Sequence, residues 1–112
     1  MPRDSMNTSY ASAEPAREAI DAIAGPLLLE FGSPWCGYCR AAQPLIAAAL
    51  DGHPDVQHVR VADASGRPLG RSFRVKLWPT LVFMRDGREV SRLVRPRDAK
   101  AIASALDGID RG

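Results

Sequence analysis

The five residues WCGYC, at positions 35–39, are the part of the sequence around which the rest is organised. They contain both cysteines of the chain, separated by two residues. An apolar run at 27–31 comes before them, and a helical pattern at 40–50 comes directly after them. This order predicts a buried strand, a short loop, and a helix that begins at or near Cys36.

A cysteine at the start of a helix has a chemical consequence. The first backbone N–H groups of a helix have no partner within the helix and carry the positive end of its dipole, so they favour a thiolate over a thiol. Cys36 is therefore the expected nucleophile. Cys39 lies one turn further on the same face, where it can attack a mixed disulfide at Cys36 and release the bound partner. The pair predicts thiol–disulfide exchange.

Two other uses of a Cys-x-x-Cys pair are open at this point. A structural zinc ion needs four ligands, but no second cysteine pair follows, and His53 and His58 are not spaced as the ligands of such a site. A structural disulfide is the other use, although a bridge that closes so short a loop restricts the unfolded chain little. We expect no metal and no cofactor.

Length and composition bound the class of protein. The 112 residues fit one domain with one core, and 46% hydrophobic and 25% charged residues are ordinary for a globular protein. A net charge of +2 is too small to predict binding to nucleic acid. The first ten residues contain neither a signal peptide nor a membrane span. We therefore expect a cytoplasmic monomer, in which a cysteine pair is more often catalytic than structural.

The remaining pattern predicts one α/β domain over residues 12–112, preceded by a disordered tail at 1–11. The expected helices span 13–24 with Ser12 as its cap, 36–50 with Pro44 as a kink, about 69–73, and 97–106 with Gly108 after its end. The expected strands span 27–31, 56–63, 81–84 and 89–94. Asp86-Gly87 is a hairpin signal, so the last two strands are antiparallel, whereas the first two flank a helix and are parallel.

These features resemble the thioredoxin family over about Ala13 to Ile109. The segment WCGYCR at 35–40 is similar to the family's WCGPCK motif, and Pro44 is similar to the kink proline of its active-site helix. Trp78-Pro79-Thr80 resembles its cis-proline segment, and Asp86-Gly87 resembles its hairpin turn. The resemblance implies a thioredoxin fold, with a central mixed sheet of four to five strands flanked by helices on both faces.

The resemblance also implies roles. Cys36 would attack a protein disulfide, Cys39 would resolve the intermediate, and Glu30, where thioredoxins carry a buried acid, would accept the Cys39 proton through water. The implied substrate-binding residues are Trp35, Gly37, Tyr38, Trp78, Pro79 and Thr80. The backbone at Trp78 would pair with an extended substrate strand, and both tryptophans would form a docking surface, unless they are plain core residues. The implied partners are disulfide-containing proteins and a recycling enzyme similar to thioredoxin reductase, with no nucleic acid and no membrane.

The sequence departs from the family pattern at Tyr38, where proline is usual. The dipeptide Gly-Tyr is similar to that of a periplasmic disulfide isomerase family. Without the proline, a backbone N–H becomes available to stabilise the Cys36 thiolate, which predicts a reduction potential less reducing than about −270 mV. An isomerase or oxidant is therefore an alternative function. A binding module with one dedicated partner is a non-enzymatic alternative.

Three further departures surround the site. Glu30 replaces an aspartate; it either reaches solvent at the strand end or is buried with a raised pKa. The family's lysine that pairs with the buried acid has no clear counterpart in the strand at 59–61. Trp78 is bulkier than the usual residue before the proline, which would narrow the substrate range. Arg95 falls where glycine is usual; with Arg97 and Lys100 it forms either a basic surface for acidic partners or a solvated one.

Overall fold

The computed structural model describes Tyr10 and residues 13–110. In chain order its elements are α1 (Arg17–Asp21), β1 (Pro26–Gly32), α2 (Gly37–Leu50), β2 (Gln57–Ala62), α3 (Pro68–Ser72), β3 (Thr80–Arg85), β4 (Arg88–Val94) and α4 (Ala99–Asp110). None of the helices in these residues is long and apolar enough to cross a membrane.

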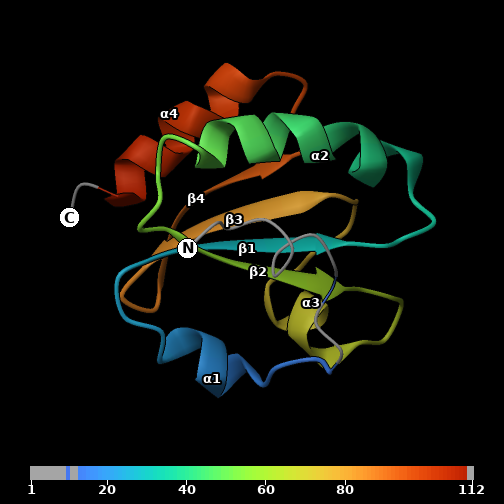
Figure 1. The fold of residues 1–112 in the computed structure, drawn as a ribbon. Coiled ribbons are helices and arrows are strands. Elements are labelled where there is room, and N and C mark those ends of the chain that lie inside the picture. The colour runs from blue at the N-terminus through green and yellow to red at the C-terminus, as the bar shows by residue number, and fades with distance from the viewer. Residues whose placement is uncertain (1–9, 11–12, 111–112) are drawn as a thin grey trace.

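One mixed sheet forms the centre of the molecule (Figure 1). In the described part of the chain it has four strands in the order β2-β1-β3-β4, with β1 and β2 parallel and the other neighbours antiparallel. Helices α2 and α4 cover one face, and α1 and α3 cover the other. The predicted α/β architecture is confirmed, with the lower of the two expected strand numbers.

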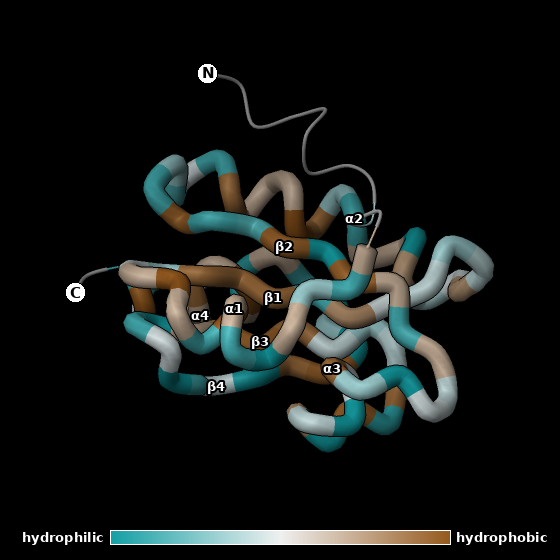
Figure 2. Tube along the Cα trace, turned by 90° about the horizontal axis from the view of Figure 1, so that it is seen from below, coloured by the Kyte–Doolittle hydropathy of each residue, from teal (hydrophilic) through white to brown (hydrophobic). Residues whose placement is uncertain are grey.

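Strand β1 is buried on both faces, which explains its continuous apolar run. Leu28 points into the core beneath α2 and α4, whereas Leu27, Leu29 and Phe31 point into the core beneath α1 and α3. Figure 2 shows β1 as a hydrophobic segment, in contrast to the mostly hydrophilic edge strand β4. Burying each large apolar side chain contributes roughly 1.5–3 kcal/mol, so β1 fixes the position of the loop that follows it.

Two predicted helices, α1 and α4, have different bounds in the structure. Helix α1 covers five residues and not 13–24, because Pro15 disfavours helix in the residue before it and Ala16 is extended, with ψ 152°. The Ser12 cap lies outside the described residues, as does the predicted tail except Tyr10. Helix α4 continues through Gly108 to Asp110, because Ile109 is fully buried in the core and tertiary packing outweighs the poor helix propensity of glycine.

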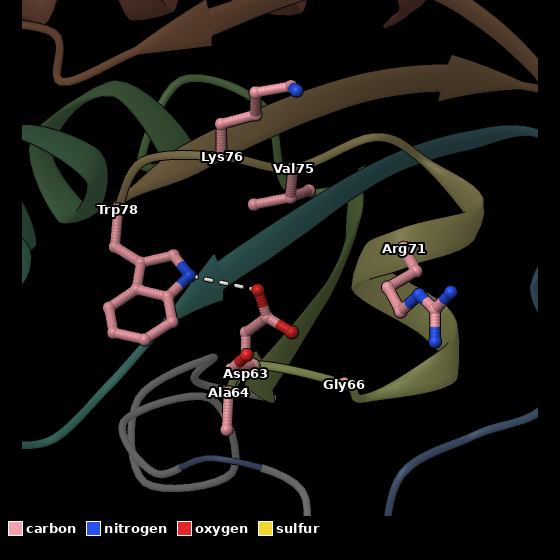
Figure 3. Close-up of a pocket in the computed structure, with 8 residues that line it drawn as sticks. Asp63, Ala64, Gly66, Arg71, Val75, Lys76 and Trp78 are labelled. Atoms are coloured by element: carbon pink, nitrogen blue, oxygen red, sulfur yellow. Dashed lines mark hydrogen bonds between the residues drawn. The ribbon is translucent and has the colours of Figure 1, made fainter.

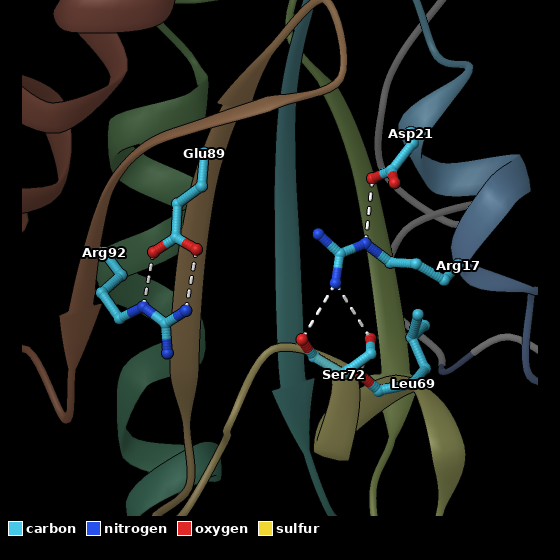
Figure 4. Close-up of polar contacts among 6 residues, drawn as sticks. All are labelled: Arg17, Asp21, Leu69, Ser72, Glu89 and Arg92. Carbon is cyan, nitrogen blue, oxygen red and sulfur yellow. Dashed lines mark hydrogen bonds and ion pairs between the residues drawn. The ribbon is translucent and has the colours of Figure 1, made fainter.

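The short α1 is held to α3 by one arginine (Figure 4). Arg17 donates from Nε to Asp21 and from Nη1 to the carbonyl and hydroxyl oxygens of Ser72, at 2.9 and 3.2 Å. Its guanidinium also lies 3.8 Å from the ring centroid of Phe73. A helix of five residues is marginal alone, so these contacts and the buried Ile20 supply its stability.

The predicted hairpin turn is confirmed at Asp86 and Gly87, whose φ angles are 51° and 82°. Two positive φ angles are typical of the type I′ turn that joins twisted antiparallel strands. The Asp86 carboxylate accepts the Gly25 N–H at 2.7 Å, and the Asp86 N–H donates to the Gly25 carbonyl at 3.1 Å. The turn is therefore tied to the segment that leads into β1.

We expect Gly87→Ala to destabilise the fold more than Gly66→Ala. Both glycines have positive φ, 82° and 85°, so each substitution introduces backbone strain of about 1 kcal/mol. A Cβ at position 87 would also lie 2.2 Å from the Asp21 carbonyl oxygen, whereas nothing lies within 4 Å of one at position 66. Urea unfolding should show a further loss of about 2 kcal/mol for Gly87→Ala. Equal losses in the two variants would contradict this packing of the turn against α1.

Candidate active site

The end of β1 brings Cys36 to the start of α2, as predicted. Cys36 is the N-cap residue, with extended φ and ψ of −86° and 117°. Its sulfur accepts the backbone N–H of Cys39 at 3.1 Å and lies 3.8 Å from the carbonyl oxygen of Trp78, to which its S–H can donate. Both cysteines are free thiols. The partly exposed sulfur of Cys36 therefore lies at the N-terminus of α2 and accepts one backbone N–H there, a position from which it can reach a substrate.

Cys39 lies behind Cys36 and is 1% exposed. Burial, together with the hydrogen bond to Cys36 and the nearby negative charge, raises the pKa of its thiol to about 12. A Cβ built on Gly32 would lie only 2.9 Å from the Cys39 sulfur, so the close approach of β1 to this thiol requires glycine. Cys39 thus stays protonated at neutral pH until another group accepts its proton.

An exposed apolar rim surrounds Cys36. Trp35 is 88% exposed, Tyr38 is 60% exposed, and Leu77 of the neighbouring loop is 49% exposed. Gly37 is exposed too, with open space where a side chain would lie. Large exposed apolar side chains gathered at one place on a small domain are typical of a binding surface.

The loop of residues 77–80 faces the dithiol from the other side. The peptide bond between Trp78 and Pro79 is cis. Pro79 is buried, and Thr80 is 1% exposed and donates its hydroxyl to the Leu77 carbonyl at 2.6 Å. The side chain of Thr80 therefore shapes this loop from within, and the Trp78 carbonyl is the part of the loop that reaches Cys36.

The Trp78 side chain turns toward a pocket of about 620 Å³ (Figure 3). Its indole Nε1–H donates to Asp63 at 2.9 Å, and its ring packs against the core beneath α1 and α3. Arg71 and Lys76 also line this pocket. Trp78 is half-buried: its ring packs against the core and forms part of the pocket wall, and its backbone carbonyl contacts the Cys36 sulfur.

Glu30 is fully buried in β1, on the face covered by α2. Its carboxylate accepts from His58 Nε2 at 2.8 Å and from Gln43 Nε2 at 2.8 Å, and it pairs with Arg60 Nε at 3.3 Å. Burial alone would raise the pKa of Glu30, but the hydrogen bonds and the positive charge of these partners outweigh burial and lower it. The expectations of a raised pKa and of a side chain in solvent are both wrong.

The sequence did not lead us to predict the residues that pair with Glu30. Arg60 is directly opposite Glu30 in the parallel register of β1 and β2, and His58 is two residues earlier on the same face. The expectation that strand 59–61 holds no clear counterpart of the lysine that pairs with the buried acid is therefore wrong, since Arg60 pairs with Glu30. The alternation of His58 and Arg60 with Val59 and Val61 is the signal that could have indicated it.

Tyr10 completes this buried cluster, although the sequence placed it in the tail. The Arg60 guanidinium lies 4.2 Å from the centroid of its ring. Its hydroxyl lies beside Gly32, where an added Cβ would meet it at 2.8 Å, and so it neighbours Cys39. Burial is the main cause that raises the pKa of Tyr10 to about 12. A ring far away in sequence thus helps to exclude water from the inner thiol.

Gln43 links the buried acid to the dithiol. Its side-chain amide donates both to Glu30 and to the Cys39 carbonyl, at 2.8 and 3.1 Å. Within Tyr10 and residues 13–110, no three His, Cys, Asp or Glu side chains are grouped so that they could hold a metal ion. The site thus has an accessible sulfur at Cys36 and a protonated sulfur at Cys39 behind it. The buried Glu30 carboxylate is linked to the Cys39 backbone through the side-chain amide of Gln43.

Comparisons with known proteins agree with this geometry. The family model described as Thioredoxin matches residues 8–108. Thioredoxin from Chlamydia trachomatis is 36% identical over 88 residues, which are 77% of this chain and 85% of that protein. Protein disulfide-isomerase A2 from Pongo abelii is 38% identical over 86 residues, which are 71% of this chain but only 16% of that protein. The solved structure of reduced thioredoxin 2 from Pseudomonas aeruginosa PAO1 is 54% identical, with a TM-score of 0.81 over 92% of this chain and 95% of that chain.

We expect iodoacetamide to label the folded, reduced protein once, on Cys36. Cys39 is buried and its pKa is about 12, so it remains an unreactive thiol up to about pH 10. Mass spectrometry of peptides should find Cys39 labelled only after unfolding in urea. Cys36→Ser is the matched control and should take up no label when folded. An adduct on Cys39 in the folded protein would contradict the inner position of this thiol.

We expect Glu30→Gln to destabilise the protein by about 3 kcal/mol at neutral pH, because it removes the carboxylate charge that pairs with the buried Arg60 guanidinium. The folded-state pKa of Glu30 is lowered, so its contribution is complete above the unfolded pKa of about 4.3 and is lost as the pH falls through the folded pKa. The difference from wild type in urea unfolding should therefore narrow below about pH 4. The exposed Glu18→Gln serves as control, and a difference that stays constant with pH would contradict the lowered pKa.

Proposed function

The chain belongs to the thioredoxin family and is a thioredoxin-like disulfide oxidoreductase, and from this premise we propose that it reduces protein disulfides by dithiol exchange. The observation that carries this proposal is the pair of sulfurs at the start of α2. Cys36 is partly exposed and receives an amide hydrogen bond, whereas Cys39 is buried and protonated behind it. Such a difference between two thiols suits one for attack and the other for resolution.

In the first step, the Cys36 thiolate attacks one sulfur of a substrate disulfide. A bond forms between Cys36 and that sulfur, the substrate S–S bond breaks, and the other substrate sulfur leaves as a thiolate that takes up a proton. In the second step, Cys39 loses its proton and attacks the Cys36 sulfur. The mixed disulfide breaks, the second substrate sulfur leaves as a thiol, and the chain holds a Cys36–Cys39 disulfide. Two electrons have passed to the substrate.

The second step needs an acceptor for the Cys39 proton, and we assign this role to Glu30, through water. Its negative charge acts on Cys39, and its lowered pKa keeps it ionised at neutral pH. A carboxylate with a lowered pKa is a weak base, so it holds the proton only briefly and passes it on, for example to the leaving substrate thiolate.

Substrate binding in this proposal uses the exposed rim and the neighbouring loop. Trp35, Gly37 and Tyr38 offer an accessible apolar contact around Cys36. The backbone of Trp78 lies close enough to Cys36 to pair with an extended substrate segment, as strands added to a sheet edge do. Pro79 and Thr80, both buried, hold that backbone in place.

The proposed cycle needs a supply of electrons, because each turnover oxidises the dithiol. A reductase similar to thioredoxin reductase would return the Cys36–Cys39 disulfide to two thiols. The cycle also needs a compartment where thiols are kept reduced, which is the cytoplasm. Each proposed step uses residues of one chain, and we propose that the protein acts as a monomer.

A disulfide isomerase or oxidant is the second candidate, favoured by the Gly37-Tyr38 dipeptide and by the similarity to protein disulfide-isomerase A2. In the structure, the amide that donates to the Cys36 sulfur is that of Cys39, and a proline at position 38 would leave this amide in place. The reduction potential against a glutathione buffer separates the candidates. A value near −270 mV indicates a reductant, and one near −180 mV indicates an isomerase or oxidant.

We expect Cys39→Ser to trap substrates as mixed disulfides on Cys36, because the resolving thiol is missing while the attacking one remains. Affinity purification and mass spectrometry should recover several proteins, each released by dithiothreitol. The matched control Cys36→Ser should trap nothing and reduce no disulfide in a test protein. A single trapped protein would instead indicate a dedicated partner, and turnover by Cys36→Ser would overturn the proposed function.

A further inference from the structure

Arg95 occupies an unusual backbone position beside the active site. It follows β4 directly and has a φ of 52°, in the left-handed region where glycine is the residue without strain. Its backbone N–H donates to the Pro79 carbonyl at 2.9 Å. Arg74 and Asp86 also have positive φ, so it is the contacts of the Arg95 side chain, and not its backbone angle alone, that bear on its role.

The guanidinium of Arg95 contacts both segments that flank Cys36. Its Nε donates to the Trp78 carbonyl at 2.8 Å, and its central carbon lies 4.0 Å from the ring centroid of Tyr38. The same Trp78 carbonyl lies 3.8 Å from the Cys36 sulfur. The Trp78 carbonyl therefore contacts both the attacking sulfur of Cys36 and the guanidinium of Arg95. A carbonyl oxygen has two lone pairs, so it can still accept from a substrate backbone.

A groove of about 710 Å³ extends from this point between α2 and the β4–α4 connection. We call it the arginine groove, and its walls include Tyr38, Ala41, Leu45, Val94, Arg95 and Arg97. Its floor is apolar, and of the described residues that line it none is acidic. Neither Arg95 nor Arg97 has an ion-pair partner within Tyr10 and residues 13–110. The groove therefore presents uncompensated positive charge above an apolar surface.

We propose that Arg95 determines substrate specificity by selecting disulfides that carry an Asp or Glu beside the attacked cysteine. The inference rests on the proposed function and names the class of substrate for the same site. An extended segment bound to Cys36 and to the Trp78 backbone passes the guanidinium. Arginine binds carboxylates with several parallel N–H donors, and stacking on Tyr38 fixes the plane of those donors. The apolar floor takes a neighbouring apolar side chain.

Two oxidised peptides test this proposal, identical except for Glu or Gln next to the attacked cysteine. The measurement is the second-order rate constant of the reduced protein with each peptide, in single turnovers without added reductant. We expect wild type to prefer the Glu peptide by about five-fold at low salt, the size of one partly exposed ion pair. Because salt screens exposed charges, the preference should fall toward one at about 0.5 M salt.

The variant Arg95→Gly should lose the preference and keep its fold, since glycine adopts the φ of this position without strain. Arg95→Gln, which keeps the side-chain length and removes the charge, should lose it too. Arg88→Gln removes one exposed positive charge at the far end of β4 and should retain the preference.

Equal rates for the two peptides in wild type would overturn the proposal, and so would a preference that survives in Arg95→Gly. A loss of rate with both peptides alike in Arg95→Gly, with the ratio unchanged, would show that Arg95 only holds the Trp78 loop. Failure of wild type to reduce either peptide would overturn the proposed function itself, and this inference with it.

Discussion

The hydrogen bond from the Cys39 amide to the Cys36 sulfur is the interaction on which the site depends. It makes Cys36 the cap of α2, so the chain must leave β1, turn within a few residues, and begin a helix there. Because β1 is buried on both faces, close packing holds the start of this turn in place. One sulfur is thereby directed outward and the other is enclosed, and the chemical difference between two identical residues follows from their places in one helical turn.

The interior beside the dithiol contains charged side chains, which remain ionised because they are paired with one another. A buried carboxylate without partners would become neutral, but Glu30 has donors from α2 and from β2. Arg60 spreads its charge between this carboxylate and the ring of Tyr10. Gln43 then joins the cluster to the backbone of the helix that carries the cysteines. The Glu30–Arg60 pair, the ring of Tyr10 and the amide of Gln43 therefore enclose the Cys39 thiol on the side that faces away from the substrate.

Patterns local in sequence predicted most of this molecule. The apolar run and the cysteine motif located β1 and α2, and the hairpin signal located the turn after β3. Features that depend on which strands pair, or on distant contacts, were missed. The ion pair of Glu30 with Arg60 needs the register of β1 and β2, and Tyr10 reaches the site from far away in sequence. Gly108 looked like a helix end, but burial of Ile109 overrides that local preference.

Strand β4 forms one margin of the sheet, and its exposed side chains bear on how the protein behaves in crowded solution. An edge strand has unpaired backbone N–H and C=O groups, with which a strand of a second molecule can form hydrogen bonds, and such pairing is a common start of aggregation. Here the margin carries a bidentate Glu89–Arg92 pair (Figure 4). The pairing of β4 with β3 is also irregular between Phe83 and Met84. The charged side chains and the irregular pairing at this edge strand oppose the addition of a strand from a second molecule. The domain can therefore expose an apolar rim for substrates at the active site without aggregating through the edge of its sheet.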